Sequence, residues 1–118
     1  MKAYTDIEQS RKLAEILSLE SADQTWARIV FAGASFDIPE EMQYKHRDIP
    51  FQDYNGIGTP CWSLAALLSV FSVTLECTKG LYHCISSDGK DFIFSKVTDN
   101  PVDACVELII ILHEQNIL

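Results

Sequence analysis

The four cysteines and the three histidines have the widest chemical range of any residues in this chain. A structural zinc site typically uses closely paired ligands such as Cys-x2-Cys, but Cys61, Cys77, Cys84 and Cys105 are all far apart in sequence. His83 adjoins Cys84, yet neighbours on a strand point to opposite faces. The sequence also lacks a glycine-rich phosphate loop. We therefore expect neither a metal site nor a cofactor.

Cys61 is the best candidate for a catalytic nucleophile. Thr59 and Pro60 are residue types preferred at the N-cap and the first position of a helix, so they predict a helix over residues 60–71. Cys61 would lie in its first turn, where the helix dipole lowers the pKa of a thiol. A small cysteine-dependent hydrolase or transferase is one functional hypothesis. The favoured interpretation is that Cys61 packs in the core beside Leu64, and the enzyme is the alternative.

Trp62 follows directly and is expected to be a buried aromatic residue. Helical neighbours do not share a face, so Trp62 would turn away from Cys61 and its indole N–H would seek a carbonyl acceptor. In the alternative interpretation, Trp62 forms the floor of a partner-binding pocket with Tyr54 and Phe51.

Residues 32–58 show no periodic pattern, and prolines and glycines punctuate them, so the sequence predicts one long irregular loop. A structureless loop of this length is unusual in a compact domain, so it is either a functional loop or contains an unrecognised short strand. Four aromatic residues are interleaved with charges in this loop: Phe36, Tyr44, Phe51 and Tyr54. They either anchor the loop to the body of the domain or contact a protein partner.

Helices are predicted at both ends of the chain. Thr5 and Glu8 form a potential capping box before a peripheral helix over residues 6–17. Near the C-terminus, Asp99 or Asn100 would cap a helix over residues 101–115. That helix begins at a proline and is apolar over most of its surface, which is typical of a buried helix.

A strand is predicted over residues 73–78, because apolar and polar residues alternate there, and two more over 81–86 and 91–98, because short turns separate these segments. Residues 25–31 favour a further strand, with a helix starting near Ser21 as the alternative. The expected fold is a single α+β domain. An antiparallel sheet of three to four strands would carry helices 60–71 and 101–115 on one face and leave a polar face at Thr74, Glu76 and Thr78.

The charge and the apolar content of the chain limit the classes of partner that we expect it to bind. The chain has 118 residues, 9 basic and 17 acidic, which gives a net charge of −8. An acidic surface repels nucleic acid, and no apolar stretch approaches the ~20 residues of a membrane span. The sequence lacks the apolar core of a signal peptide near Met1, so a cytoplasmic location with reduced thiols is expected.

Three segments carry a resemblance: YTDIEQSRKLAEILSLESAD, TPCWSLAALLSV and DNPVDACVELIIILHE. The chain resembles an uncharacterised family of small proteins in gut bacteria and their prophages, and is similar to phage-type α-β-α sandwich domains. The shared motifs are core and capping motifs, so the resemblance implies no functional residues. The favoured hypothesis is a non-catalytic protein-interaction module, encoded by a phage or mobile element, that binds a protein partner through residues 32–58.

Overall fold

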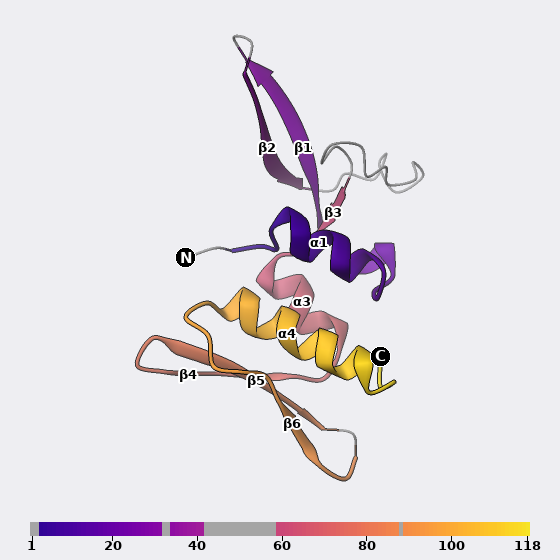
Figure 1. Cartoon of the computed structure of the whole chain (residues 1–118), viewed down its shortest axis with the longest axis vertical. Helices are drawn as coiled ribbons and strands as arrows, with labels where there is room; N and C mark the ends of the chain where they lie inside the picture. The colour runs from indigo at the N-terminus through magenta and orange to yellow at the C-terminus, as the bar shows by residue number, and fades with distance from the viewer. Residues whose placement is uncertain (1–2, 32–33, 42–58, 88) are drawn as a thin grey trace.

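The computed structural model describes residues 3–31, 34–41, 59–87 and 89–118 (Figure 1). It is an α+β fold with two antiparallel three-stranded sheets. The helical elements are α1 (Ile7–Ala14), the short 3-10 helix η1 (Leu19–Ser21), α3 (Leu64–Val70) and α4 (Pro101–Glu114). The strands are β1 (Gln24–Phe31), β2 (Ala34–Glu41), β3 (Thr59–Cys61), β4 (Thr74–Thr78), β5 (Leu81–Ser87) and β6 (Phe92–Phe94).

The predicted fold class and the three-stranded meander with helices packed on it are confirmed. The strand order of the meander is β4-β5-β6, and α4 lies along it in contact with β5. The segment considered as a fourth strand forms part of a separate sheet, with the order β2-β1-β3. Its β1–β2 hairpin projects away from the helices (Figure 1).

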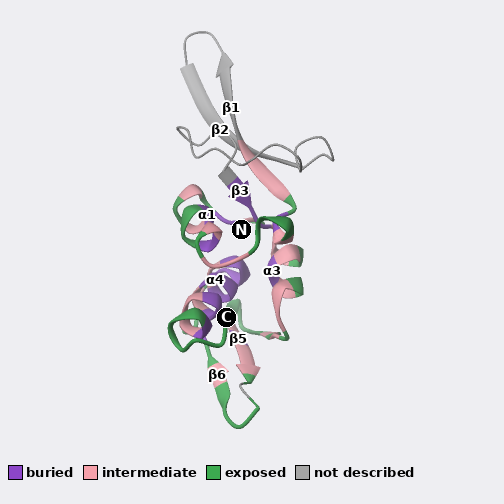
Figure 2. Cartoon of the chain, turned by 90° about the vertical axis from the view of Figure 1, so that its right-hand side faces the viewer, coloured by how far each residue is buried: buried purple, intermediate pink, exposed green. Residues whose placement is uncertain are grey.

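The core lies around α4. Leu108, Ile109 and Leu112 on this helix are buried, and α4 contacts α3, α1 and β5 (Figure 2). Asn100 caps the helix as expected, because its side chain accepts hydrogen bonds from the Val102 amide at 2.8 Å and the Asp103 amide at 3.4 Å. Burying one large aliphatic side chain stabilises the fold by about 1.5–3 kcal/mol, so α4 supplies much of the apolar driving force.

The predicted start of α1 is wrong by one residue. Asp6 caps the helix and forms the capping box with Gln9, whereas Thr5 is buried and bonds elsewhere. The helix also ends at Ala14, short of the predicted residue 17. Its buried Leu13 belongs to the same core cluster as α4, so this helix is an integral part of the packing.

The predicted helix over residues 60–71 is also wrong at its start. Thr59–Cys61 forms β3, and the helix begins at Leu64 with Ser63 as its N-cap. Proline suits a first helical position, but it is equally tolerated on an edge strand, and β3 is the edge of its sheet. Pro60 lies opposite Thr25 in that pairing.

The structure corrects the single long loop over residues 32–58. Ala34–Glu41 is strand β2, paired along its whole length with β1. Pro39 is accommodated because β2 is the other edge of this sheet. The strand over residues 25–31 is confirmed as β1, and the alternative helix starting near Ser21 is wrong.

In the meander, β4 and β5 match their predicted ranges to within one residue, while β6 is shorter than the predicted strand over residues 91–98. Beyond β6 the chain still follows β5. The Ser95 amide donates to the Cys84 carbonyl at 2.9 Å, and Thr98 forms an isolated bridge with Tyr82. The polar face is confirmed on β4, where Thr74, Glu76 and Thr78 are exposed.

Candidate functional site

Cys61 lies at the end of β3 and is fully buried. Because it is in a strand and precedes the Ser63 cap, the helix-dipole argument for an acidic thiol does not apply. Burial raises the pKa of Cys61 to about 11, against the smaller opposite effect of hydrogen bonds from Thr5 and Ser10. The thiol is therefore protonated near neutral pH, the wrong state for a nucleophile.

Two buried hydroxyl groups surround this thiol. The Thr5 and Ser10 hydroxyl oxygens are 2.7 Å apart, and the Thr5 hydroxyl donates to the Cys61 sulfur at 3.7 Å. The Cys61 thiol donates back to the Thr5 carbonyl at 3.5 Å. The indole N–H of Trp26 donates to the Ser10 hydroxyl at 3.2 Å. This network ties α1 and the segment before it to the sheet β2-β1-β3, which is a structural role.

Trp62 is a core residue, as predicted. It is fully buried, and its indole N–H donates to the Ser21 hydroxyl at 2.9 Å, so a side-chain oxygen takes the place of the expected carbonyl. Its backbone pairs with Thr5: the Thr5 amide donates to the Trp62 carbonyl at 2.9 Å. Nearby, the Asp23 carboxylate accepts hydrogen bonds from both the amide and the hydroxyl of Ser63, the cap of α3.

Cys84 on β5 and Cys105 on α4 form a second thiol cluster. Their sulfur atoms are 3.4 Å apart, and both side chains are fully buried. The hydrogen bond between the thiols lowers the pKa of Cys84 and raises that of Cys105, which burial raises further. The contact between these two thiols packs the sheet β4-β5-β6 against α4. All four cysteines are free, and Cys77 is the exposed one.

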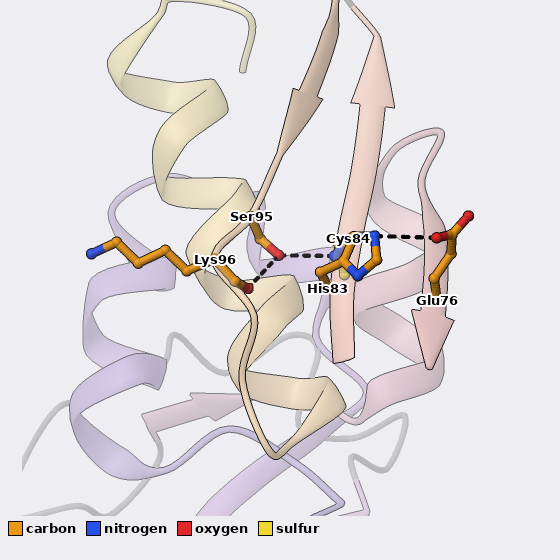
Figure 3. A network of polar contacts seen from close by, with 5 residues as sticks. All are labelled: Glu76, His83, Cys84, Ser95 and Lys96. Atoms are coloured by element: carbon orange, nitrogen blue, oxygen red, sulfur yellow. Dashed lines mark hydrogen bonds and ion pairs between the residues drawn. The ribbon is translucent and has the colours of Figure 1, made fainter. Parts of the chain in front are cut away.

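The strand β5 also carries the polar contacts shown in Figure 3. His83 Nε2 lies 3.2 Å from the Glu76 carboxylate on the exposed face of the sheet, an ion pair when the imidazole is protonated. On the other side of the strand, the Cys84 amide donates to the Ser95 hydroxyl at 2.8 Å, and that hydroxyl donates to the Lys96 carbonyl at 3.0 Å. The Ser95 hydroxyl therefore accepts the hydrogen bond of the β5 backbone at the point where strand β6 ends.

The exposed face of β5 and β6 carries several large apolar residues beside the polar His83 and Ser87, unlike the polar face on β4. Directly paired residues share a face, so Ile85 lies beside Phe94 on the face opposite to that of buried Cys84. Leu81, Phe92 and Phe94 are 48%, 72% and 55% exposed. We call Leu81, Ile85, Phe92 and Phe94 the outer apolar face.

Our sequence reasoning missed this surface, although its signal was present. The sequence Phe92-Ile93-Phe94 places large apolar residues on both faces of a strand, and only one face can pack on α4. An alternating strand with one solvated face would instead carry polar residues at positions 92 and 94. The run of three apolar residues therefore indicates that the strand carries large apolar side chains on both of its faces.

Of the four aromatic residues predicted to bind a partner, one lies within the described residues. Phe36 lies on β2, where its backbone pairs with Ile29. Tyr44, Phe51 and Tyr54 lie outside the described residues, so the proposed pocket of Trp62 with Phe51 and Tyr54 lies outside them too. Their predicted role stays a prediction.

Within the described ranges, no three His, Cys, Asp or Glu side chains are grouped as metal ligands would be. In the same part of the chain, no helix combines the length and the apolar character needed to cross a membrane. Comparison with protein families, curated proteins and solved structures finds no match to this chain. The resemblance to a family of gut bacteria and prophages thus stays a prediction.

Proposed function

We propose that this protein is a non-catalytic protein-interaction module that binds through the outer apolar face. The observation that carries the proposal is the exposure of two phenylalanines, Phe92 and Phe94, on one strand of a sheet whose other face packs on α4. Scattered exposed apolar residues are common, but neighbouring ones on one sheet face, such as Ile85, Phe94 and Phe92, are typical of a protein contact.

The side chains beside the phenylalanines suit such a contact. Phe94 lies next to His83, with ring centroids 6.4 Å apart, and His83 in turn contacts Glu76. Aromatic anchors bordered by polar groups are the usual composition of a binding patch, since the anchors lose water on binding while the polar rim stays hydrated.

Capture from a cell lysate tests this proposal. The immobilised wild-type chain is compared with a Phe92→Ser/Phe94→Ser variant, and bound proteins are identified by mass spectrometry. A Leu19→Ser variant is the matched control, because Leu19 is also exposed but lies on η1. We expect a partner that is retained by the wild type and the control and lost from the double variant. Identical capture by all three proteins would contradict the proposal.

The cysteine-dependent hydrolase or transferase is separated from this proposal by thiol labelling of the native protein. Cys77 is exposed and should react rapidly, whereas Cys61 should react only as the protein unfolds. A Cys77→Ser variant removes the background reaction. Rapid labelling of Cys61 in that variant would favour the enzyme hypothesis.

A further inference from the structure

The strand β6 is an edge of the sheet β4-β5-β6, so one side of its backbone has no neighbouring strand in that sheet. The Ser95 amide donates to the Cys84 carbonyl, which fixes the side of the strand that faces β5. In an antiparallel ladder, successive residues alternate in direction. The N–H and C=O groups of Phe92 and Phe94 therefore point away from β5, toward the free edge.

This edge has features that favour pairing with another strand. Exposed edges are normally protected by short strand length, charge, proline or a bulge; β6 is short, with three residues, but it has no charge or proline within the strand. The sequence of β6 contains only Phe92, Ile93 and Phe94, and both phenylalanines are exposed. An incoming strand would satisfy the outward backbone groups and cover part of the two aromatic rings at the same time.

The strand is complementary to itself. Phe-Ile-Phe reads the same in both directions, so a two-fold axis through Ile93 places Phe92 of one copy opposite Phe94 of the other. Because both of these residues direct their backbone groups outward, each such pair can exchange two hydrogen bonds. Contacts of this kind, with the same patch on both chains, are the commonest arrangement in homodimers.

Charge also favours a second copy at this edge. The chain carries −8 in total, but residues 72–98 contain three acidic and three basic residues and are neutral. In this register Asp91 of one copy lies opposite Ser95 of the other, and Lys90 lies opposite Lys96, so the favourable contribution is the neutrality of the segment and not a paired opposite charge. Two copies can approach here without the net repulsion that the rest of the molecule creates.

We propose that β6 pairs antiparallel with β6 of a second copy of this chain, which joins the two meanders into one six-stranded sheet centred on Ile93. The inference rests on the proposed function, because β6 carries Phe92 and Phe94 of the outer apolar face and pairs through its edge. The aromatic faces of both copies then form one continuous surface.

Sedimentation velocity over a range of protein concentrations tests the pairing. We expect the wild type to shift from 13.3 kDa to twice that mass as concentration rises. Phe94→Lys should weaken the association at least tenfold, because like charges would lie near the axis. Val97→Lys is the matched control, since Val97 is exposed but lies beyond β6, and it should still dimerise. Circular dichroism and urea unfolding confirm that each variant is folded.

Cross-linking tests the register in a Cys77→Ser background. Phe92→Cys and Phe94→Cys chains are oxidised separately and as a mixture. The proposed register places position 92 opposite position 94, so the mixture should cross-link more completely than either chain alone. Equal cross-linking in all three samples would overturn the register.

The failure of this inference can be told apart from that of the proposed function. A wild type that stays monomeric, or a dimer that Phe94→Lys does not weaken, overturns the pairing. If the chain is monomeric and an identified different protein is lost from the Phe92→Ser/Phe94→Ser variant, the proposed function stands and the second copy is wrong. If the chain is monomeric and the Phe92→Ser/Phe94→Ser variant captures the same proteins as the wild type, both the pairing and the proposed function are wrong.

Discussion

The two faces of the sheet β4-β5-β6 are built from the same strands but have different surroundings. On the inner face, Cys84 is fully buried against Cys105 of α4. On the outer face, Phe92 and Phe94 are aromatic and exposed. The comparison teaches that apolar character alone does not identify the core of this protein. On this sheet, contact with α4 separates the buried apolar residues from the exposed ones.

The largest expected effect comes from the most voluminous fully buried side chain. Trp62→Ala should destabilise the protein by about 3–5 kcal/mol, because it removes a large apolar volume and leaves the Ser21 hydroxyl without its indole donor. Urea unfolding of wild type and variant measures this difference. A loss below about 1 kcal/mol would place Trp62 with the weakly packed residues of the outer face.

The pH dependence of stability tests the buried Cys61. Its pKa rises from 9.0 to about 11 in the folded protein, so the unfolded chain loses this proton at lower pH than the folded one. The stabilisation is therefore complete below pH 9.0 and is lost as pH rises toward about 11, a decline of about 2–3 kcal/mol.

Other groups titrate in the same range, so Cys61→Ala is the reference protein. Denaturant unfolding of both proteins is repeated at several pH values across that window. We expect the wild type to lose stability more steeply than Cys61→Ala. Parallel curves would mean that the thiol is as well solvated in the folded protein as in the unfolded chain.

A smaller effect is expected at the cap of α4. Asn100→Ala removes the acceptor for the Val102 and Asp103 amides and should cost about 1 kcal/mol. Asn100→Asp keeps an acceptor oxygen and is the matched control, with stability close to wild type. The midpoint of urea unfolding reports both changes. An equal loss of stability in the two variants would show that the side-chain amide nitrogen of Asn100 stabilises the protein more than its acceptor oxygen does.

The smallest effect is expected on the outer face. Phe92→Ser should change the stability of the monomer by no more than about 0.5 kcal/mol, because Phe92 is 72% exposed. The measurement is made by urea unfolding at a protein concentration where the wild type is monomeric. A loss comparable to that of Trp62→Ala would mean that the two faces contribute equally to the fold, and the comparison would fail.

The elements that were predicted well have signals that agree with one another. In α4, Asn100 and Pro101 mark the start and the apolar residues that follow mark the buried face, so its range was predicted almost to the residue. Strands β4 and β5 combine alternation with a short turn at Lys79-Gly80. Such local signals are readable because no distant contact opposes them.

The wrong predictions arise where one residue type is compatible with two kinds of secondary structure. Pro60 indicated a helix start and Pro39 was assigned to the irregular loop, yet both lie on edge strands. Edge position is a property of the assembled sheet, so the sequence alone does not reveal it. The outer apolar face has the same origin, because only the position of α4 decides which face of β6 stays exposed.

The backbone pairing of Thr5 with Trp62 has a consequence for the order of folding. These residues are 57 apart in sequence, whereas Cys84 and Cys105 are 21 apart. Closing the longer loop costs about 0.9 kcal/mol more conformational entropy, on the logarithmic dependence of closure on length. We therefore expect the meander and α4 to assemble early and to form the surface onto which the N-terminal segment later docks, as the last long-range step of folding.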